Sequence, residues 1–365
     1  PPPPLSRTPR HTRTASSSRG LGDVYKRQEH KLFARISGRL GSIAPDCPYL
    51  PRLNGLSKAN WTHSQLMLRS SANALDTLIA EDIPIMLLKG GALHVATFKD
   101  HGPRINSDLD ILVRGSDFSR AIKLLYGTGW SSRHSVEFAS ARWRFMPGIN
   151  LCLEPHGDID VHHQPVHGAR VADDVIDALW ARAERAQFHG RSVLIPSIAD
   201  LLVFASAHAV HCQRKRKPGA VWVFDLATLA RQPTLNPDQL VASACAFNAV
   251  LATHATLAYL QHLTCEPVIE RLAKALENNV TGWRPWLHFF CQSAWPPHGN
   301  KMKRRDKLLR HLQLRFSGTT LVENEYDFIP RSQLHFSASK AVDETVIDDS
   351  SAAYCRRHEV PLPQS

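Results

Sequence analysis

The chain has 365 residues, of which 43% are hydrophobic, and a formal net charge of +11. This length suits two modest domains with buried cores, and no run approaches the ~20 consecutive apolar residues that a membrane span needs. The seven cysteines include no Cys-x-x-Cys pair, which argues against a zinc knuckle or a disulfide scaffold and for a reducing, cytoplasmic compartment.

Nearly half of the positive charge lies in residues 1–28, where six basic residues stand against one acid and give +5. The Pro, Ser and Arg content of this segment cannot bury a core. Its end, Asp23-Val24-Tyr25-Lys26-Arg27-Gln28, looks like the translation of a transposon end used to prepare sequencing libraries, with an ordinary basic tail as the alternative. We leave the segment out of the fold prediction, and the charge that remains argues against a nucleic-acid partner.

The first half of the chain alternates helical and strand patterns. We expect, in chain order, a helix over 29–40, a Pro- and Gly-rich loop over 41–58, a helix over 61–80, a strand over 83–88, a helix over 92–98, a loop over 99–106, a strand over 108–113 and a helix over 117–126. Ser116 is the expected N-cap of the last helix. The strand over 83–88 ends in Lys89-Gly90-Gly91, a turn whose backbone N–H groups can face an anion.

Two carboxylates stand one residue apart in the strand over 108–113. Side chains i and i+2 of a strand point to the same face, so Asp108 and Asp110 project together while Leu109 and Ile111 face a core. Like charges side by side repel each other, and each costs desolvation, so a shared cation explains the pair best.

A β-hairpin is expected over 149–153 and 158–162, because two alternating runs flank strong turn chemistry. In the second run Asp158, Asp160 and His162 share one face, so Asp160 supplies a third carboxylate. Asp158 lies beside the turn, where Asp often bonds the local backbone, and we leave it out of the site. His162 is expected either to orient Asp160 or merely to pack.

From residue 172 onward the pattern is mostly helical, and strand signals are lost near 193–197. We expect helices over 172–186, 198–211, 221–231, 237–262, 268–276 and 301–310. Beyond about residue 316 the periodicity fades.

These motifs resemble those of the uncharacterised nucleotidyltransferase family within the DNA polymerase β-like superfamily. The resemblance covers roughly residues 60–230 and rests on Lys89-Gly90-Gly91, Arg104, Asp108-Leu109-Asp110-Ile111-Leu112-Val113 and Asp160-Val161-His162. It implies an α+β fold, in which a small mixed sheet with flanking helices precedes a helical C-terminal domain. The expected division is a disordered segment over 1–28, the core with its N-terminal helices over 29–192, a helical domain over 193–316 and a largely irregular tail over 317–365.

The resemblance also implies an enzyme that moves an NMP group from an NTP to an unidentified hydroxyl acceptor and releases pyrophosphate. Two Mg²⁺ ions, with Mn²⁺ as an alternative, would be held by Asp108, Asp110 and Asp160. Lys89, Gly90, Gly91 and Arg104 would contact the nucleotide.

Other interpretations stay open. The wider superfamily usually has Gly-Ser where this chain has Gly90-Gly91, so a catalytically silent relative that binds nucleotide or a partner protein is the second hypothesis. Arg104 alternatively pairs with Asp100 or Asp108. The basic run over 214–217 is either a solvated loop or a contact for phosphates.

The helical half carries no signature of a particular reaction. His208 and His211 have a spacing that can suit zinc, but no second ligand pair stands at a recognisable distance, which favours a structural role. Together with Trp222 and Asp225 they resemble the family's helical region, and their roles are left open. The acceptor, the preferred base and the oligomeric state are open as well.

Overall fold

The computed structural model of the chain describes residues 32–97, 104–132, 134–136, 139, 148–166, 171–212 and 221–294. The expected segments over 1–28 and 317–365, the helix over 301–310 and the basic run over 214–217 lie outside these residues. Within them, no helix is both long and apolar enough to cross a membrane.

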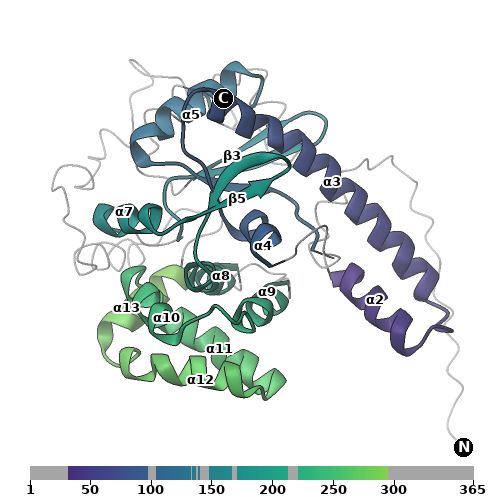
Figure 1. The fold of residues 1–365 in the computed structure, drawn as a ribbon, viewed down its shortest axis with the longest axis vertical. Coiled ribbons are helices and arrows are strands. Elements are labelled where there is room, and N and C mark those ends of the chain that lie inside the picture. The colour runs from purple at the N-terminus through teal and green to yellow at the C-terminus, as the bar shows by residue number, and fades with distance from the viewer. Residues whose placement is uncertain are drawn as a thin grey trace, which may run out of the picture.

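A six-stranded mixed sheet lies at the centre of the protein (Figure 1), in the order β3-β4-β2-β1-β6-β5. The strands are β1 (Met86–Leu87), β2 (Leu109–Leu112), β3 (Gly148–Leu153), β4 (Gly157–His162), β5 (Glu184–Phe188) and β6 (Arg191–Ile195). The β2–β4 and β1–β6 pairs are parallel, and the other three pairs are antiparallel. The fold is thus α+β, as expected from the sequence.

Helices cover the sheet and form a separate layer beside it. They are α2 (Phe33–Ile43), α3 (Leu50–Ala80), α4 (Lys89–Thr97), α5 (Gly115–Gly127), α7 (Asp173–Ala181), α8 (Ile198–Cys212), α9 (Val221–Ala230), α10 (Pro237–Ala246), α11 (Val250–Thr264), α12 (Pro267–Leu276), the short 3-10 helix η3 (Glu277–Asn279) and α13 (Trp283–Ala294).

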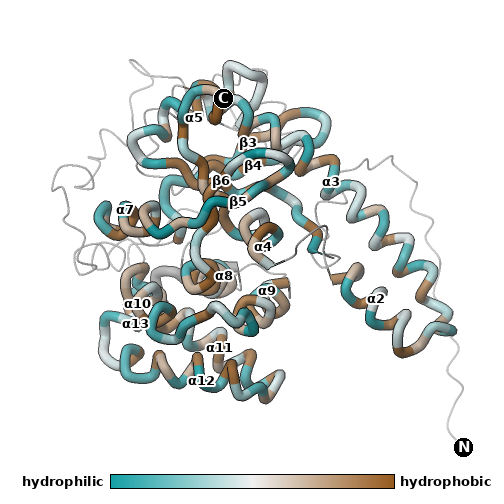
Figure 2. Tube along the Cα trace, viewed as in Figure 1, coloured by the Kyte–Doolittle hydropathy of each residue, from teal (hydrophilic) through white to brown (hydrophobic). Residues whose placement is uncertain are grey.

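The layers meet through α4 and α8. Helix α3 packs on β4, and α4 packs on β2, β5 and β6. Helix α8 contacts α4 on one side and α9, α10, α11 and α13 on the other. Hydrophobic positions gather around the central strands and α8 (Figure 2). Helix α2 packs on α3, and this helical hairpin extends away from the rest of the described chain (Figure 1).

The central strands are buried because they are apolar on both faces. All four residues of β2 are buried, as are both residues of β1. A strand covered on both faces reads as a continuous apolar run rather than as an alternation. Asp110 interrupts this run, and a buried charge within a central strand requires compensation by neighbouring groups.

Two helix starts differ from the expectation. Helix α3 begins at Leu50, so the loop expected over 41–58 is too long: Pro51 occupies the first turn, where a missing N–H group is tolerated. Gly55 lies within the same helix at an exposed position. Helix α5 begins at Gly115 with Arg114 as its N-cap, so Ser116 is not the cap.

The largest error of the sequence prediction is the hairpin of β5 and β6, whose residues were expected to be helical up to 186 and were assigned to no element after it. His189 and Gly190 form its two-residue turn, both with positive φ (48° and 79°). Four of the five residues of β5 are exposed or half-buried, so this edge strand lacks the apolar alternation that indicates a strand. β6 crosses the boundary that was expected between residues 192 and 193.

The later helices differ less. The helix expected over 237–262 is two helices, α10 and α11, which are separated at Asn248, where φ is 53°. Neither Gly nor Pro marks this break. Helix α13 was not expected from the sequence.

Candidate active site

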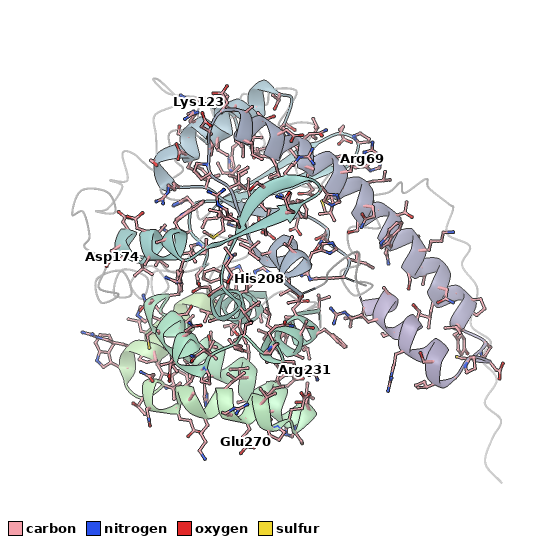
Figure 3. The ribbon with its side chains drawn as sticks, in the orientation of Figure 1. Arg69, Lys123, Asp174, His208, Arg231 and Glu270 are labelled. Carbon is pink, nitrogen blue, oxygen red and sulfur yellow. The ribbon has the colours of Figure 1, made fainter. Side chains whose placement is uncertain are left out.

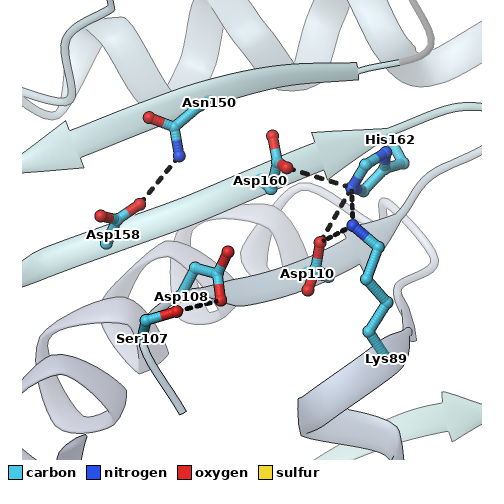
Figure 4. Close-up of polar contacts among 8 residues, drawn as sticks. All are labelled: Lys89, Ser107, Asp108, Asp110, Asn150, Asp158, Asp160 and His162. Carbon is cyan, nitrogen blue, oxygen red and sulfur yellow. Dashed lines mark hydrogen bonds and ion pairs between the residues drawn. The ribbon is translucent and has the colours of Figure 1, made fainter. Parts of the chain in front are cut away.

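The site lies where β2 and β4 run side by side. Their parallel register pairs Asp110 with Asp160 and Leu112 with His162. Because side chains on neighbouring strands point to the same face at paired positions, the two carboxylates meet. The i, i+2 spacing on β4 adds the imidazole of His162 to the same face (Figure 4).

Four polar groups converge there. Lys89 Nζ lies 2.5 Å from Asp110 Oδ1. His162 Nε2 lies 3.0 Å from the same oxygen, 3.4 Å from Asp160 Oδ2 and 3.4 Å from Lys89 Nζ. Asp160 is the most accessible of the four, with 25% of its side chain exposed against 5% for Asp110. A ligand therefore meets Asp160 first.

Asp110, Asp160 and His162 can jointly hold a metal ion, since one ligand atom of each lies within 4.8 Å of the others. No second cluster of three or more potential ligands occurs among the described residues. The carboxylate oxygens suit a hard cation such as Mg²⁺ or Mn²⁺. The imidazole suits Mg²⁺ less well, and its contacts with both carboxylates fit the role of an orienting neighbour.

Asp108 stands apart from this cluster. Asp108 immediately precedes β2, which begins at Leu109, and it is not among the three residues whose ligand atoms all lie within 4.8 Å of one another. Its Oδ1 accepts a hydrogen bond of 2.9 Å from the Ser107 hydroxyl. Its charge contributes to the raised pKa of Lys89 and opposes the lowering of the pKa of Asp160 by His162 and Lys89, so it adds to the negative potential of the site. Metal binding by Asp108 stays a prediction.

Lys89 opens α4 with a φ of 42°, a left-handed conformation that is uncommon for a residue other than glycine. Its ammonium group contacts Asp110, whereas the sequence pointed to a phosphate. Burial by itself lowers the pKa of Lys89, but the carboxylates of Asp110, Asp160 and Asp108 outweigh burial and raise it. Lys89 therefore stays charged.

The carboxylates and the imidazole are electrostatically coupled. Burial raises the pKa of Asp110, but Lys89 and His162 outweigh it, so the pKa of Asp110 is lowered. The pKa of Asp160 is lowered for the same reason, with burial opposed first by His162. Burial and Lys89 lower the pKa of His162, yet Asp160 and Asp110 raise it above its usual value. Both carboxylates are thus ionised.

Arg104 pairs with Asp225 and not with the expected alternative Asp108, while the other alternative, Asp100, lies outside the described residues. Nε and Nη2 of Arg104 donate to Asp225 Oδ1 and Oδ2 over 3.1 and 2.9 Å. Nη1 donates to Asn106 Oδ1. Asp225 belongs to α9, 121 residues along the chain, so sequence reasoning could not pair the two.

The two glycines of the Lys-Gly-Gly turn lie in close contact with neighbouring side chains. A Cβ on Gly90 would meet the Arg104 guanidinium and the Asn106 side-chain oxygen, and a Cβ on Gly91 would lie 2.9 Å from Leu109 Cδ1. A serine at Gly91 would therefore press on the buried side chain of β2.

Asp158 has a structural role, although its carboxylate pairs with a side chain on the neighbouring strand and not with the local backbone as expected. Its carboxylate accepts a hydrogen bond of 2.8 Å from Asn150 Nδ2 on β3. Its backbone N–H donates to Ser71 Oγ, and its carbonyl accepts from the same hydroxyl. Asp158 thereby ties β4 to β3 and to α3 (Figure 4).

The histidines of α8 do not form a metal cluster with other described residues. His208 lies on α8 (Figure 3). On α9, the ring of Trp222 lies 5.6 Å from that of Tyr259 on α11. Trp222 thus packs between helices, and Asp225 contacts the proposed site residue Arg104.

A mixed sheet with an acidic cluster on two parallel strands, beside a glycine turn that opens a helix, defines a protein of the nucleotidyltransferase class. The family described as "Uncharacterised nucleotidyltransferase" matches residues 27–264. The chain belongs to this family. No functionally curated protein matches it.

Solved structures of three proteins are similar to parts of the chain. The lincosamide antibiotic adenylyltransferase LnuA, bound to lincomycin, is 17% identical over 45% of this chain and 96% of its own, with a TM-score of 0.32. The antibiotic-resistance factor ANT(2'')-Ia is 12% identical over 55% and 99%, with a TM-score of 0.38. An antigenic nucleotidyltransferase-like protein from Paracoccidioides brasiliensis is 15% identical over 58% and 94%, with a TM-score of 0.32.

Proposed function

We propose that the protein is a Mg²⁺-dependent nucleotidyltransferase that transfers an NMP group from an NTP to a hydroxyl acceptor and releases pyrophosphate. The observation that carries the proposal is the meeting of Asp110, Asp160 and His162 on adjacent parallel strands. Family membership supports the same reaction class. The cysteine pattern supports a cytoplasmic setting.

The residues have separate tasks in this reaction. Asp110 and Asp160, with Asp108 as a further ligand, would hold two Mg²⁺ ions, or Mn²⁺ in their place. Bound there, the ions would stabilise the charge that builds on the attacking and leaving oxygens. His162 donates to the carboxylates and keeps them oriented toward the ions.

The transfer is a single displacement at the α-phosphorus. The acceptor oxygen forms a bond to that phosphorus as the bond to the bridging oxygen of the leaving pyrophosphate breaks. Asp160, the more accessible carboxylate, takes the hydroxyl proton. Arg104 and the first N–H groups of α4, at Gly90 and Gly91, would bind the phosphates, and Lys89 would join them once a bound metal ion displaces it from Asp110.

One observation favours a second function. The ammonium group of Lys89 lies 2.5 Å from Asp110, in the place where a cation between the carboxylates would bind. A lysine that stays there permanently would replace the metal ion, and the protein would then bind nucleotide or a partner protein without catalysis.

Pyrophosphate release from labelled ATP, GTP, CTP and UTP, with Mg²⁺ and a cell extract as the source of acceptors, separates these functions. We expect Asp110→Asn to reduce release by about 10²–10³-fold, the scale of losing one charge-stabilising group. Asp174→Asn is the matched control, because Asp174 is exposed on α7, away from the site (Figure 3).

Each outcome of this experiment supports a different function. Nucleotide binding without turnover would favour the catalytically silent protein. Retention on DNA that falls with salt and is unchanged by Asp110→Asn would contradict both and indicate a nucleic-acid-binding module.

A further inference from the structure

We infer that Asp225 is a positioning residue, which holds Arg104 in the orientation that binds the triphosphate of the nucleotide. The inference rests on the proposed function and adds the helical part of the chain to the nucleotide site. It begins from the paired contacts between Asp225 and Arg104, at 3.1 and 2.9 Å. Both side chains are largely buried, with 12% and 13% exposed.

The pairing leaves one edge of the guanidinium for a ligand. Arginine has five N–H donors. Asp225 takes one on Nε and one on Nη2, and Asn106 takes one on Nη1. The other two donors lie one on Nη1 and one on Nη2, and a phosphate accepts charge-assisted hydrogen bonds from guanidinium donors of this kind.

This edge lies beside the start of α4. The guanidinium lies so close to Gly90 that a Cβ there would meet it. The first N–H groups of an α-helix lack acceptors within the helix and attract anions. Asp225 therefore places two guanidinium donors next to the backbone donors of the Lys89-Gly90-Gly91 turn.

Asp225 also keeps Arg104 away from the acidic cluster. Burial lowers the pKa of Arg104, but Asp225 most strongly, and then Asp108 and Asp110, raise it. Arg104 is thus attracted from two sides. Without Asp225, the guanidinium would turn toward Asp108 and Asp110 and neutralise the carboxylates that are proposed to hold the metal ions.

The chain contains a matched control pair. Nε and Nη2 of Arg182 donate to Asp200 on α8 over 2.8 and 2.7 Å. This pair has the same two-bond geometry and also joins the sheet part to the helical part. Asp200 is fully buried and additionally accepts from Ser243 and Ser197. None of these contacts involves the acidic cluster.

The test measures the affinity of the full-length protein for inorganic tripolyphosphate in the presence of Mg²⁺ by isothermal titration calorimetry, with thermal unfolding followed in parallel. The probe has no base, so the unknown base preference does not matter. We expect Asp225→Asn to weaken affinity about tenfold. Asp200→Asn should lower the unfolding temperature at least as much and leave the affinity of the folded protein unchanged.

Two further variants separate positioning from general support of the fold. Arg104→Lys removes the two-donor edge, so in that background Asp225→Asn should change affinity less than twofold. If Asp225→Asn does not fold, Asp225→Glu replaces it, since the added methylene displaces the carboxylate and should weaken affinity about fivefold.

Wild-type affinity in a folded Asp225 variant, or equal losses in the Asp225 and Asp200 variants, would overturn the inference while leaving the proposed function in place. Failure of the unmodified protein to bind either tripolyphosphate or any NTP would instead overturn the proposed function, and the inference with it.

Discussion

The ammonium group of Lys89 and a bound metal ion would compete for the same carboxylates. Lys89 Nζ lies 2.5 Å from Asp110 Oδ1, and the carboxylates of Asp160 and Asp108 also stabilise the charged form of Lys89. A divalent ion that binds these carboxylates must therefore displace the ammonium group or endure its repulsion, which amounts to several kcal/mol at close range in a partly buried site.

Lys89→Met should therefore raise the affinity of the nucleotide-free protein for Mn²⁺ by at least about tenfold, or ~1.4 kcal/mol. Titration calorimetry checks the affinity, and the shift of the unfolding temperature with added Mn²⁺ checks it independently. Lys123→Met, at an exposed position of α5 distant from the site (Figure 3), should bind Mn²⁺ as the wild type does. Unchanged or weaker binding by Lys89→Met would show that Lys89 does not occupy the cation site.

The periodicity of the sequence predicted the convergence of two acidic residues of the site, but it did not predict the partners of the basic residues. Asp110 and Asp160 were predicted to converge because each stands in a strand-like run, and the two-residue period of a strand fixes which face a side chain occupies. The partner of Arg104 was missed, because Asp225 follows it by 121 residues and no local period links the two. The Lys89–Asp110 contact was missed because a lysine beside a glycine turn equally suits a phosphate.

At the scale of elements, α4 and α3 use glycine in different ways. Gly90 in the first turn of α4 has no room for a side chain, because a Cβ would meet Arg104 and Asn106. Gly55 in α3 is exposed and has nothing within 4 Å of its Cβ position. Alanine favours a helix over glycine by about 1 kcal/mol. The space around each glycine therefore decides whether its replacement by alanine raises or lowers the free energy of unfolding.

Gly55→Ala should raise the free energy of unfolding by about 0.5–1 kcal/mol, and Gly90→Ala should lower it by about 1–3 kcal/mol, the usual cost of overpacking. Urea denaturation followed by circular dichroism measures both. Tripolyphosphate affinity should fall in Gly90→Ala alone, since only there is Arg104 displaced. A gain of stability in both variants would mean that the Arg104 side chain moves aside without a loss of stability, which would contradict this prediction.

Elements were predicted well where the apolar pattern is strong and poorly where it is weak. The strands β3 and β4 alternate clearly and were predicted within a residue of their ends. β5 was read as helix because its edge position leaves most of its side chains exposed. The break between α10 and α11 occurs at Asn248, which has a positive φ. Asparagine adopts this conformation only occasionally, so its presence in the sequence is a weak indication of a break.

At the scale of the whole molecule, the sheet and the helical layer are held together by packing and by two ion pairs. Helix α8 contacts α4, while Arg182–Asp200 and Arg104–Asp225 join segments from both parts. The family match, over residues 27–264, likewise spans both. The core and the helical part are therefore consecutive segments of the chain that pack together, and we expect them to unfold in a single transition.

The stability of the molecule should fall in mild acid because of a histidine in this helical layer. His288 on α13 is 5% exposed, and burial, assisted by the charge of Arg284, lowers its pKa from 6.5 to about 4. The unfolded chain therefore binds a proton at a higher pH than the folded protein does. The stabilisation that neutral His288 provides is complete above pH 6.5 and is lost as the pH falls toward 4.

Replacing His288 should therefore make the protein less sensitive to acid. Between pH 7 and pH 4.5, the free energy of unfolding of the wild type should fall by about 2–3 kcal/mol more than that of His288→Gln, from ~1.36 kcal/mol per pKa unit. Urea denaturation at the two pH values measures the difference, and His262→Gln, at an exposed position of α11, should follow the wild type. If the wild type and His288→Gln lose the same free energy, His288 does not titrate on unfolding, and the acid sensitivity lies with other groups.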